Sequence, residues 1–189
     1  FLAQLYVQQP YTEYDKENHV EKSAVMFLNS AKTEVAAGKT EEVTITIPTK
    51  YLASYDYTNA KTYILDEGDY YFTAAAGSHE AVNNILAEQG YTVKDGMDAE
   101  ASGAVQTWKL DEFDNTTFAV ENGTEVTNVA EEADLNYWTE EETVTYLSRQ
   151  DWEGTYPINY NEVEIKVGDS PKSEEWIAEL RGETYTIQT

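Results

Sequence analysis

Residues 61–76 have the sequence Lys61-Thr-Tyr-Ile-Leu65, then Asp66-Glu-Gly-Asp69, then Tyr70-Tyr-Phe-Thr-Ala-Ala-Ala76. Two runs rich in aromatic and β-branched residues, separated by a short polar segment that contains a glycine, are typical of a β-hairpin. Gly68 can adopt the positive φ that such a turn often needs. The stretch therefore predicts two adjacent antiparallel strands.

More strands are predicted on the N-terminal side of this hairpin. Leu5-Tyr-Val7 favours a half-buried strand that Pro10 ends, and residues 24–28 form a short apolar run. Residues 42–48 alternate Val and Ile with Thr, the period of two expected of a strand with one buried face, and Gly38-Lys39 makes the turn before it. Strands joined by short turns, without helical periodicity between them, indicate an antiparallel β-sandwich.

At Gly77 the pattern changes to that of a helix. Ser78 is a candidate N-cap, Glu80 lies in the first turn and Gly90 is placed to end the helix. We expect about ten helical residues, whose apolar side chains pack on the sandwich. These side chains recur at spacings of three and four: Ala81, Val82, Ile85 and Leu86.

The charge of the chain excludes several classes of partner. Its 189 residues include 36 Asp and Glu against 12 Lys and Arg, for a formal charge of −24. Nucleic-acid binding requires clustered cations, which the sequence lacks, so no nucleic-acid partner is expected. No apolar run approaches the roughly 20 residues that cross a bilayer, so no membrane insertion is expected either. Without cysteine the chain has no disulfide and no thiolate chemistry.

The acidic residues are concentrated in the second half. Residues 1–90 carry 13 acidic and 6 basic side chains, a net charge of −7, which leaves −17 to residues 91–189. The apolar runs there are short and suggest isolated hairpins or an extended arm. Residues 174–181 predict a short C-terminal helix introduced by Ser173 and followed by Gly182.

Several strings taken together resemble the fibronectin type III-like domain of glycoside hydrolase family 3, the β-glucosidase family. Their order and spacing make the resemblance more specific than any one of them. The strings are Gln4-Leu-Tyr-Val7 with Pro10, Glu21-Lys-Ser-Ala24, Ala31-Lys-Thr33, Ala37-Gly-Lys-Thr40, Val43-Thr-Ile-Thr-Ile47, Leu52-Ala-Ser-Tyr-Asp56 and Gly68-Asp-Tyr-Tyr71.

The resemblance continues beyond the sandwich. Asp134-Leu-Asn-Tyr137 and residues 144–157 are similar to the connector of bacterial members with permuted domain order, in which an α/β sandwich domain comes first and a (β/α)₈ barrel last. The domains implied are a fibronectin type III-like β-sandwich with a terminal helix at 1–90, an insertion of unknown structure at 91–133 and a connector or arm at 134–189. The fold class is all-β: an immunoglobulin-like antiparallel sandwich with one short helix, followed by an acidic arm.

The resemblance also implies what this chain does. About two strands precede the Gln4 segment in the family's domain, so the sandwich is expected to have an unpaired edge, as in a piece cut from a longer polypeptide. The family's nucleophile (an Asp) and its acid/base (a Glu) lie on the barrel and the α/β domain. The resemblance thus implies a non-catalytic accessory region that packs between the catalytic domains of a bacterial β-glucosidase-like enzyme. Those domains are its expected partners, and no catalytic, cofactor or metal residue is predicted in this chain.

Gln150-Asp-Trp152 is similar to the Ser-Asp-Trp string of the family's nucleophile. That string ends an apolar barrel strand, however, whereas Asp151 lies in the connector match. We therefore predict interdomain docking, with a tryptophan to supply buried area and a guanidinium to bind carboxylates or carbonyls. The docking residues are Arg149, Asp151, Trp152 and Tyr156.

A carbohydrate-binding or adhesion module is the alternative function. The chain has 15 Tyr and 4 Trp, and flat aromatic rings stack on sugars, although many aromatics in a β-sandwich are core residues. The resemblance to the glycosidase family implies a secreted or cell-surface location, which the acidic, Tyr- and Thr-rich composition suits. The candidate sugar platform consists of Tyr51, Tyr55, Tyr57 and Tyr63.

Overall fold

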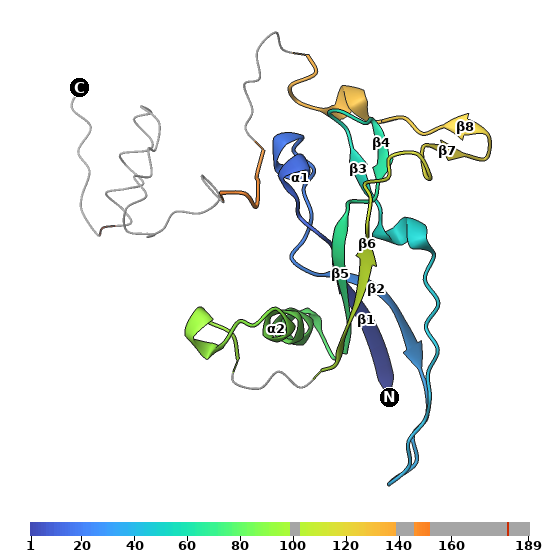
Figure 1. The fold of residues 1–189 in the computed structure, drawn as a ribbon, viewed down its shortest axis with the longest axis vertical. Helices are drawn as coiled ribbons and strands as arrows, with labels where there is room; N and C mark the ends of the chain where they lie inside the picture. Colours follow the sequence, from blue (N-terminus) through green and yellow to red (C-terminus); the bar gives the residue numbers. More distant parts are fainter. Residues whose placement is uncertain (99–102, 139–145, 152–180, 182–189) are drawn as a thin grey trace. The chain divides into compact units, whose positions relative to one another are not determined.

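A four-stranded antiparallel sheet with the order β2-β1-β5-β6 is the main layer of the fold (Figure 1). The computed structural model describes residues 1–98, 103–138, 146–151 and 181. The sheet consists of β1 (Leu2–Gln8), β2 (Met26–Lys32), β5 (Gly68–Ala75) and β6 (Val105–Leu110). The smaller elements are α1 (Glu13–Glu17), η1 (Thr49–Leu52), β3 (Ser54–Asp56), β4 (Thr62–Ile64), α2 (Ser78–Glu88), η2 (Val93–Asp95), β7 (Val120–Glu121), β8 (Thr124–Glu125) and η3 (Glu131–Ala133).

The two faces of the sheet are covered by different elements. On one face, Tyr6 and Ala75 pack with Ala81 of α2. On the other face, Val7 and Tyr70 pack with residues that flank the small β3–β4 sheet, Leu52 and Leu65. Alternate residues of β1 are therefore buried on both sides, with Val7 fully buried and Tyr6 5% exposed. The described chain is thus a mostly antiparallel β-sandwich with a short helix, as the sequence predicts.

The predicted hairpin at residues 61–76 is wrong in its pairing. β4 pairs with β3, whereas β5 pairs with β1 and β6, so the chain crosses from one layer to the other between Ile64 and Gly68. The polar segment is an anchored crossover, because Asp66 is buried on an ion pair and its carbonyl accepts the Tyr70 hydroxyl at 3.1 Å. Gly68 does take the predicted positive φ, +126°.

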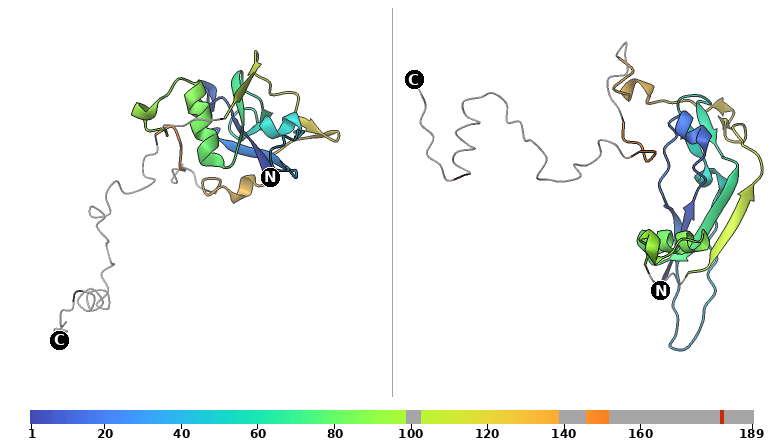
Figure 2. Two further views of the ribbon diagram at one scale, coloured as in Figure 1. Left: turned by 90° about the horizontal axis from the view of Figure 1, so that it is seen from below. Right: turned by 60° about the vertical axis from the view of Figure 1, so that its left-hand side comes forward.

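Residues 42–48 are extended but form no ladder, which differs from the predicted strand. The predicted period is nevertheless present: Val43, Ile45 and Ile47 are half-buried, and the threonines between them are exposed. The segment returns from a turn at Gly38, whose φ is +72°, and Lys39 N–H donates to the Ala36 carbonyl there. Figure 2 shows that the loop between β2 and η1, residues 33–48, extends beyond the end of the sheet.

The helix predicted after Gly77 is present as α2, with Gly90 at a φ of +88° just beyond its end. The predicted Ser78 cap is wrong. Gly77 is the N-cap and provides no side chain, and the Glu80 carboxylate instead accepts the Ala76 N–H at 2.8 Å.

The second half contributes more to the sheet than its composition suggests. Residues 105–110, expected as part of a hairpin or arm outside the sandwich, form β6 and pair along β5 from Gly68 to Thr73. β7 and β8 do form a small separate hairpin, closed by Asn122 and Gly123 with positive φ. The predicted C-terminal helix lies outside the described residues, apart from Arg181.

Candidate functional site

A short segment of the predicted connector, residues 146–151, lies on the loop before β2. Ser148 donates its hydroxyl to Glu21 Oε1 at 2.6 Å, and the Arg149 N–H donates to Glu21 Oε2 at 3.0 Å. Arg149 Nη1 donates to the Lys22 carbonyl at 3.0 Å, and its guanidinium lies 4.6 Å from the centre of the Tyr11 ring. A planar guanidinium suits this combination of carbonyl binding and ring stacking.

A buried charge cluster holds the loop before β2 in place. The Lys22 side chain is 1% exposed, and its ammonium lies 2.8 Å from the Asp15 carboxylate, against Asp66, and 3.1 Å from the Pro10 carbonyl. Burial raises the pKa of Asp66, and the Lys22 ammonium opposes that rise. A single cation therefore holds two buried carboxylates that come from separate parts of the chain.

Asp15 also belongs to the cap of α1. Thr12 and Asp15 form a capping box, in which the Thr12 N–H donates to Asp15 Oδ2 at 2.7 Å. The five-residue helix α1 thus holds one of the two carboxylates that bind Lys22.

A third buried carboxylate, Asp56, organises the turn between β3 and β4. It accepts the Tyr14 hydroxyl at 2.5 Å and backbone N–H groups of Thr58, Asn59 and Ala60. Burial alone would raise the pKa of Asp56, but these hydrogen bonds hold it below the usual value. Burial and the contact with Asp56 raise the pKa of Tyr14 to about 12. At neutral pH Asp56 is therefore ionised and Tyr14 keeps its proton, so the hydrogen bond between them persists.

The predicted docking residues are only partly within the described chain. Arg149 lies in the contact with Tyr11 and Lys22, and Asp151 is exposed at the end of the described segment. Trp152 and Tyr156 lie outside the described residues.

The four predicted platform tyrosines come from η1 and the β3–β4 hairpin. Tyr51 is 57% exposed and Tyr57 is 44% exposed, while Tyr55 and Tyr63 are half-buried. Tyr55 and Tyr63 meet edge to face, with ring centres 5.3 Å apart and planes at 77°. Since rings at this angle do not present one common plane, this pair cannot act as a single flat surface.

An apolar groove lies on the sheet face opposite α2. Its volume is about 430 Å³. One wall is the sheet, with Trp108 still 38% exposed although its ring packs 5.1 Å from that of Tyr70. The other wall is the extended segment before η1. The lining residues are Leu5, Ile45, Ile47, Pro48, Thr49, Leu52, Phe72 and Trp108.

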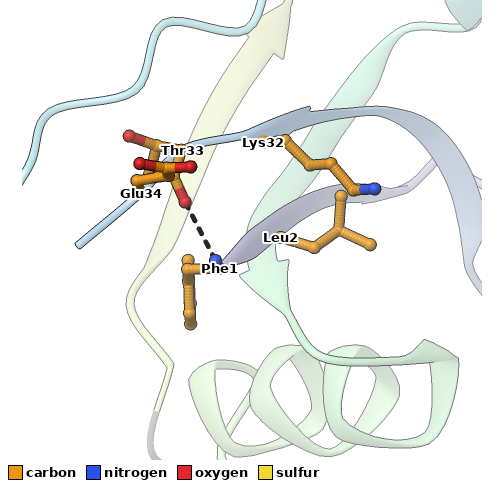
Figure 3. Close-up of a pocket in the computed structure, with 5 residues that line it drawn as sticks. All are labelled: Phe1, Leu2, Lys32, Thr33 and Glu34. Atoms are coloured by element: carbon orange, nitrogen blue, oxygen red, sulfur yellow. Dashed lines mark hydrogen bonds between the residues drawn. The ribbon is translucent and has the colours of Figure 1, made fainter.

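A second hollow, of about 480 Å³, lies where β1 begins and β2 ends (Figure 3). Its residues are Phe1, Leu2, Lys32, Thr33 and Glu34. The N-terminal ammonium donates to the Thr33 carbonyl at 2.9 Å, and the Phe1 side chain is 81% exposed. The hollow is formed by the start of β1 and by the end of β2 with the two residues that follow it.

The acidic run at residues 111–115 caps a turn. Asp114 accepts N–H groups of Thr116 and Thr117 and the Thr116 hydroxyl, and hydrogen bonds from Thr117 and Thr116 lower its pKa to about 2. Among the described residues, no three His, Cys, Asp or Glu side chains are grouped to hold a metal ion, and no helix is long and apolar enough to cross a membrane.

Two polar features were not found from the sequence. The capping box has a readable signal, because Thr12-Glu-Tyr-Asp15 places an acid three residues after a threonine. The Lys22 cluster has no such signal, since its three charged residues are brought together only by the crossover and the loop before β2.

A family model described as the fibronectin type III-like domain matches residues 2–78. The match runs from β1 to the first residue of α2 and so covers both layers of the sandwich, without β6. No curated protein and no solved structure matches the chain. Residues 2–78 are therefore similar to a fibronectin type III-like domain, in agreement with the antiparallel β-sandwich of the structure.

Proposed function

We propose that this chain is a non-catalytic accessory region of a family 3, β-glucosidase-like glycoside hydrolase, whose catalytic domains it packs between and positions. The observation that carries the proposal is the fibronectin type III-like match at residues 2–78, since this domain is typical of such enzymes. The partners are the α/β sandwich domain and the (β/α)₈ barrel of a secreted or cell-surface bacterial enzyme.

The contact of Arg149 with the sandwich supports a positioning role. It ties residues 148–149 of the predicted connector to a loop whose Lys22 side chain is held by two buried carboxylates, which gives these residues a rigid attachment to the sandwich. Displacement of a catalytic group by about 1 Å can cost on the order of 10²-fold in rate, so such rigidity matters to an enzyme built from several domains.

The purified chain tests the proposal directly. It is expected to show no turnover of nitrophenyl β-glucoside, because the family's two catalytic carboxylates come from other domains. Turnover that disappears in Asp151→Asn would overturn the proposal. The coding sequence on either side of residues 1–189 provides a second test, since it should encode the α/β domain upstream and the barrel downstream.

The exposure of Tyr51 and Tyr57 favours a second candidate, a carbohydrate-binding module. Titration with cello- and xylo-oligosaccharides separates the two functions. A binding module gives saturable quenching of tyrosine or tryptophan fluorescence that Tyr51→Ala and Tyr57→Ala abolish, whereas a scaffold gives none.

A further inference from the structure

We propose that the side chains of Lys22 and Asp66 join in an isopeptide bond, in a reaction that Asp15 assists as acid and base. The product is an amide between Lys22 Nζ and Asp66 Cγ, and one water molecule leaves. The buried ion cluster described above is the reactant of this step. The cross-link goes beyond the proposed accessory function and does not depend on the glycosidase assignment.

The two groups that react are in direct contact in the interior. Lys22 Nζ lies against Asp66 Oδ2, and the two side chains are 1% and 3% exposed. Other bonds hold both residues, because Nζ also donates to the Pro10 carbonyl at 3.1 Å and the Asp66 carbonyl accepts the Tyr70 hydroxyl at 3.1 Å. Fixed contact makes a bimolecular reaction effectively unimolecular, with effective concentrations of about 10⁵–10⁸ M in well-oriented cases. Amide formation, which free amines and carboxyl groups do not undergo at a useful rate in water, thereby becomes accessible.

Asp15 provides the proton acceptor that the amine needs. Its side chain is fully buried, and Oδ1 lies 2.8 Å from Lys22 Nζ and has no other hydrogen-bond partner within the described residues. Oδ2 accepts the Thr12 N–H at 2.7 Å, which fixes the orientation of the carboxylate. A candidate acid/base must lie within hydrogen-bond reach of the proton that it takes, and Asp15 meets this condition.

The reaction balances within these three side chains. The Lys22 ammonium passes one proton to Asp66 Oδ2, which leaves a neutral amine and a carboxylic acid. The Nζ lone pair then attacks Asp66 Cγ, and Asp15 takes a second proton from the nitrogen. Asp15 passes this proton to the Oδ2 hydroxyl, the Cγ–Oδ2 bond breaks, and water leaves. The nitrogen has lost two protons, the departing oxygen has gained both, and Asp15 ends unchanged.

The buried environment favours the amide over the ions. Charges are costly to hold in a low-dielectric interior, and the reaction replaces an ammonium and a carboxylate by one neutral group. Burial also raises the pKa of Asp66, against the opposing effect of the Lys22 ammonium. The carboxylic acid form, which an amine attacks more readily than a carboxylate, is therefore closer to hand than at an exposed aspartate.

Intact mass spectrometry of the purified full chain tests the bond. We expect a mass lower than that of the sequence by one water molecule. Trypsin should leave Lys22 uncleaved and release residues 17–32 joined to residues 62–94 through Asp66. A chain that keeps its full mass after prolonged incubation would overturn the proposal. A water loss that digestion places elsewhere, such as a cyclised aspartate at Asp95-Gly96, would overturn it too.

Variants made by cell-free translation, with the mass followed over time, test the role of each group. Lys22→Arg keeps a buried cation but should keep its full mass, because a guanidinium is not deprotonated in proteins. Asp15→Asn should form the bond at least about a hundredfold more slowly. Lys16→Arg is the matched control, since Lys16 pairs with Glu13 at the surface and should leave the reaction unchanged. Circular dichroism checks that each variant is folded. Water loss in folded Lys22→Arg, or an unchanged rate in folded Asp15→Asn, contradicts the proposal.

Discussion

At the scale of single residues, the most consequential interaction is the one that Lys22 makes in the interior. Its ammonium is the cation that holds two buried carboxylates, one from the cap of α1 and one from the crossover between the layers. Removal of one partner from a buried ion cluster leaves charge in a low-dielectric interior, which is far more costly than loss of a surface pair. Lys22 therefore links two segments that backbone pairing does not join.

Substitution Lys22→Met tests this role. The free energy of unfolding should fall by about 3 to 5 kcal/mol, because Asp15 and Asp66 would remain buried without their cation. Urea unfolding followed by circular dichroism measures the change. Lys16→Met is the matched control, since Lys16 pairs with Glu13 at the surface and should matter by less than about 0.5 kcal/mol. Adding Asp15→Asn and Asp66→Asn should restore much of the loss; if it does not, the cluster is not the cause.

At the scale of elements, a pair of buried asparagines attaches α2 to the chain that leads into β6. Asn84 Oδ1 accepts the Gly103 N–H at 3.0 Å, and Asn84 Nδ2 donates to Thr73 of β5 at 3.3 Å. Asn83 Oδ1 accepts the Asp98 N–H at 2.8 Å. These bonds explain why two weak helix formers occupy the buried side of the helix. They also help to place β6 along β5.

Gly103→Ala is expected to break this attachment. An added Cβ would lie 2.0 Å from Asn84 Nδ2, and the fully buried amide has no room to move without loss of its hydrogen bonds. The cost should be about 2 to 4 kcal/mol, measured by chemical denaturation. In an Asn84→Ala background the same substitution should cost less than about 0.5 kcal/mol. A full cost in that background would show that the clash with Asn84 is not responsible.

At the scale of the whole molecule, the sandwich includes residues beyond the helix that the sequence analysis places at its end. β6 covers the outer edge of β5, and Trp108 packs on the buried Tyr70. Residues 1–151 form one compact unit. The first 90 residues alone would expose the β5 edge and leave Asn84 and Thr73 without partners from the segment before β6.

A comparison of chains 1–90 and 1–151 tests this dependence. The shorter chain should lose at least about 3 kcal/mol of stability, the equivalent of one or two fully buried hydrophobic side chains. It should also self-associate, because β5 becomes an unprotected edge. Urea midpoints and sedimentation velocity measure both effects. A monomeric 1–90 chain of unchanged stability would show that β6 is dispensable.

The sequence by itself determined the local features of this protein. The period of two at residues 42–48, the helix after Gly77 and the positive φ of Gly68 follow from side-chain alternation, apolar spacing and backbone sterics, which act over a few residues. The sequence also indicated the class of the sandwich, because its short motifs occur in the order found in the fibronectin type III-like domain, whose family model matches residues 2–78.

Only the tertiary structure decided which strands pair and which charges meet. β4 and β5 were predicted as partners because they are neighbours in sequence, but the burial of Asp66 on Lys22 separates them into two layers. The unpaired segment beside the groove has a strand's pattern without a ladder, since pairing requires a second strand at the right distance. Such contacts join residues far apart in the chain, and no local pattern of side chains encodes them.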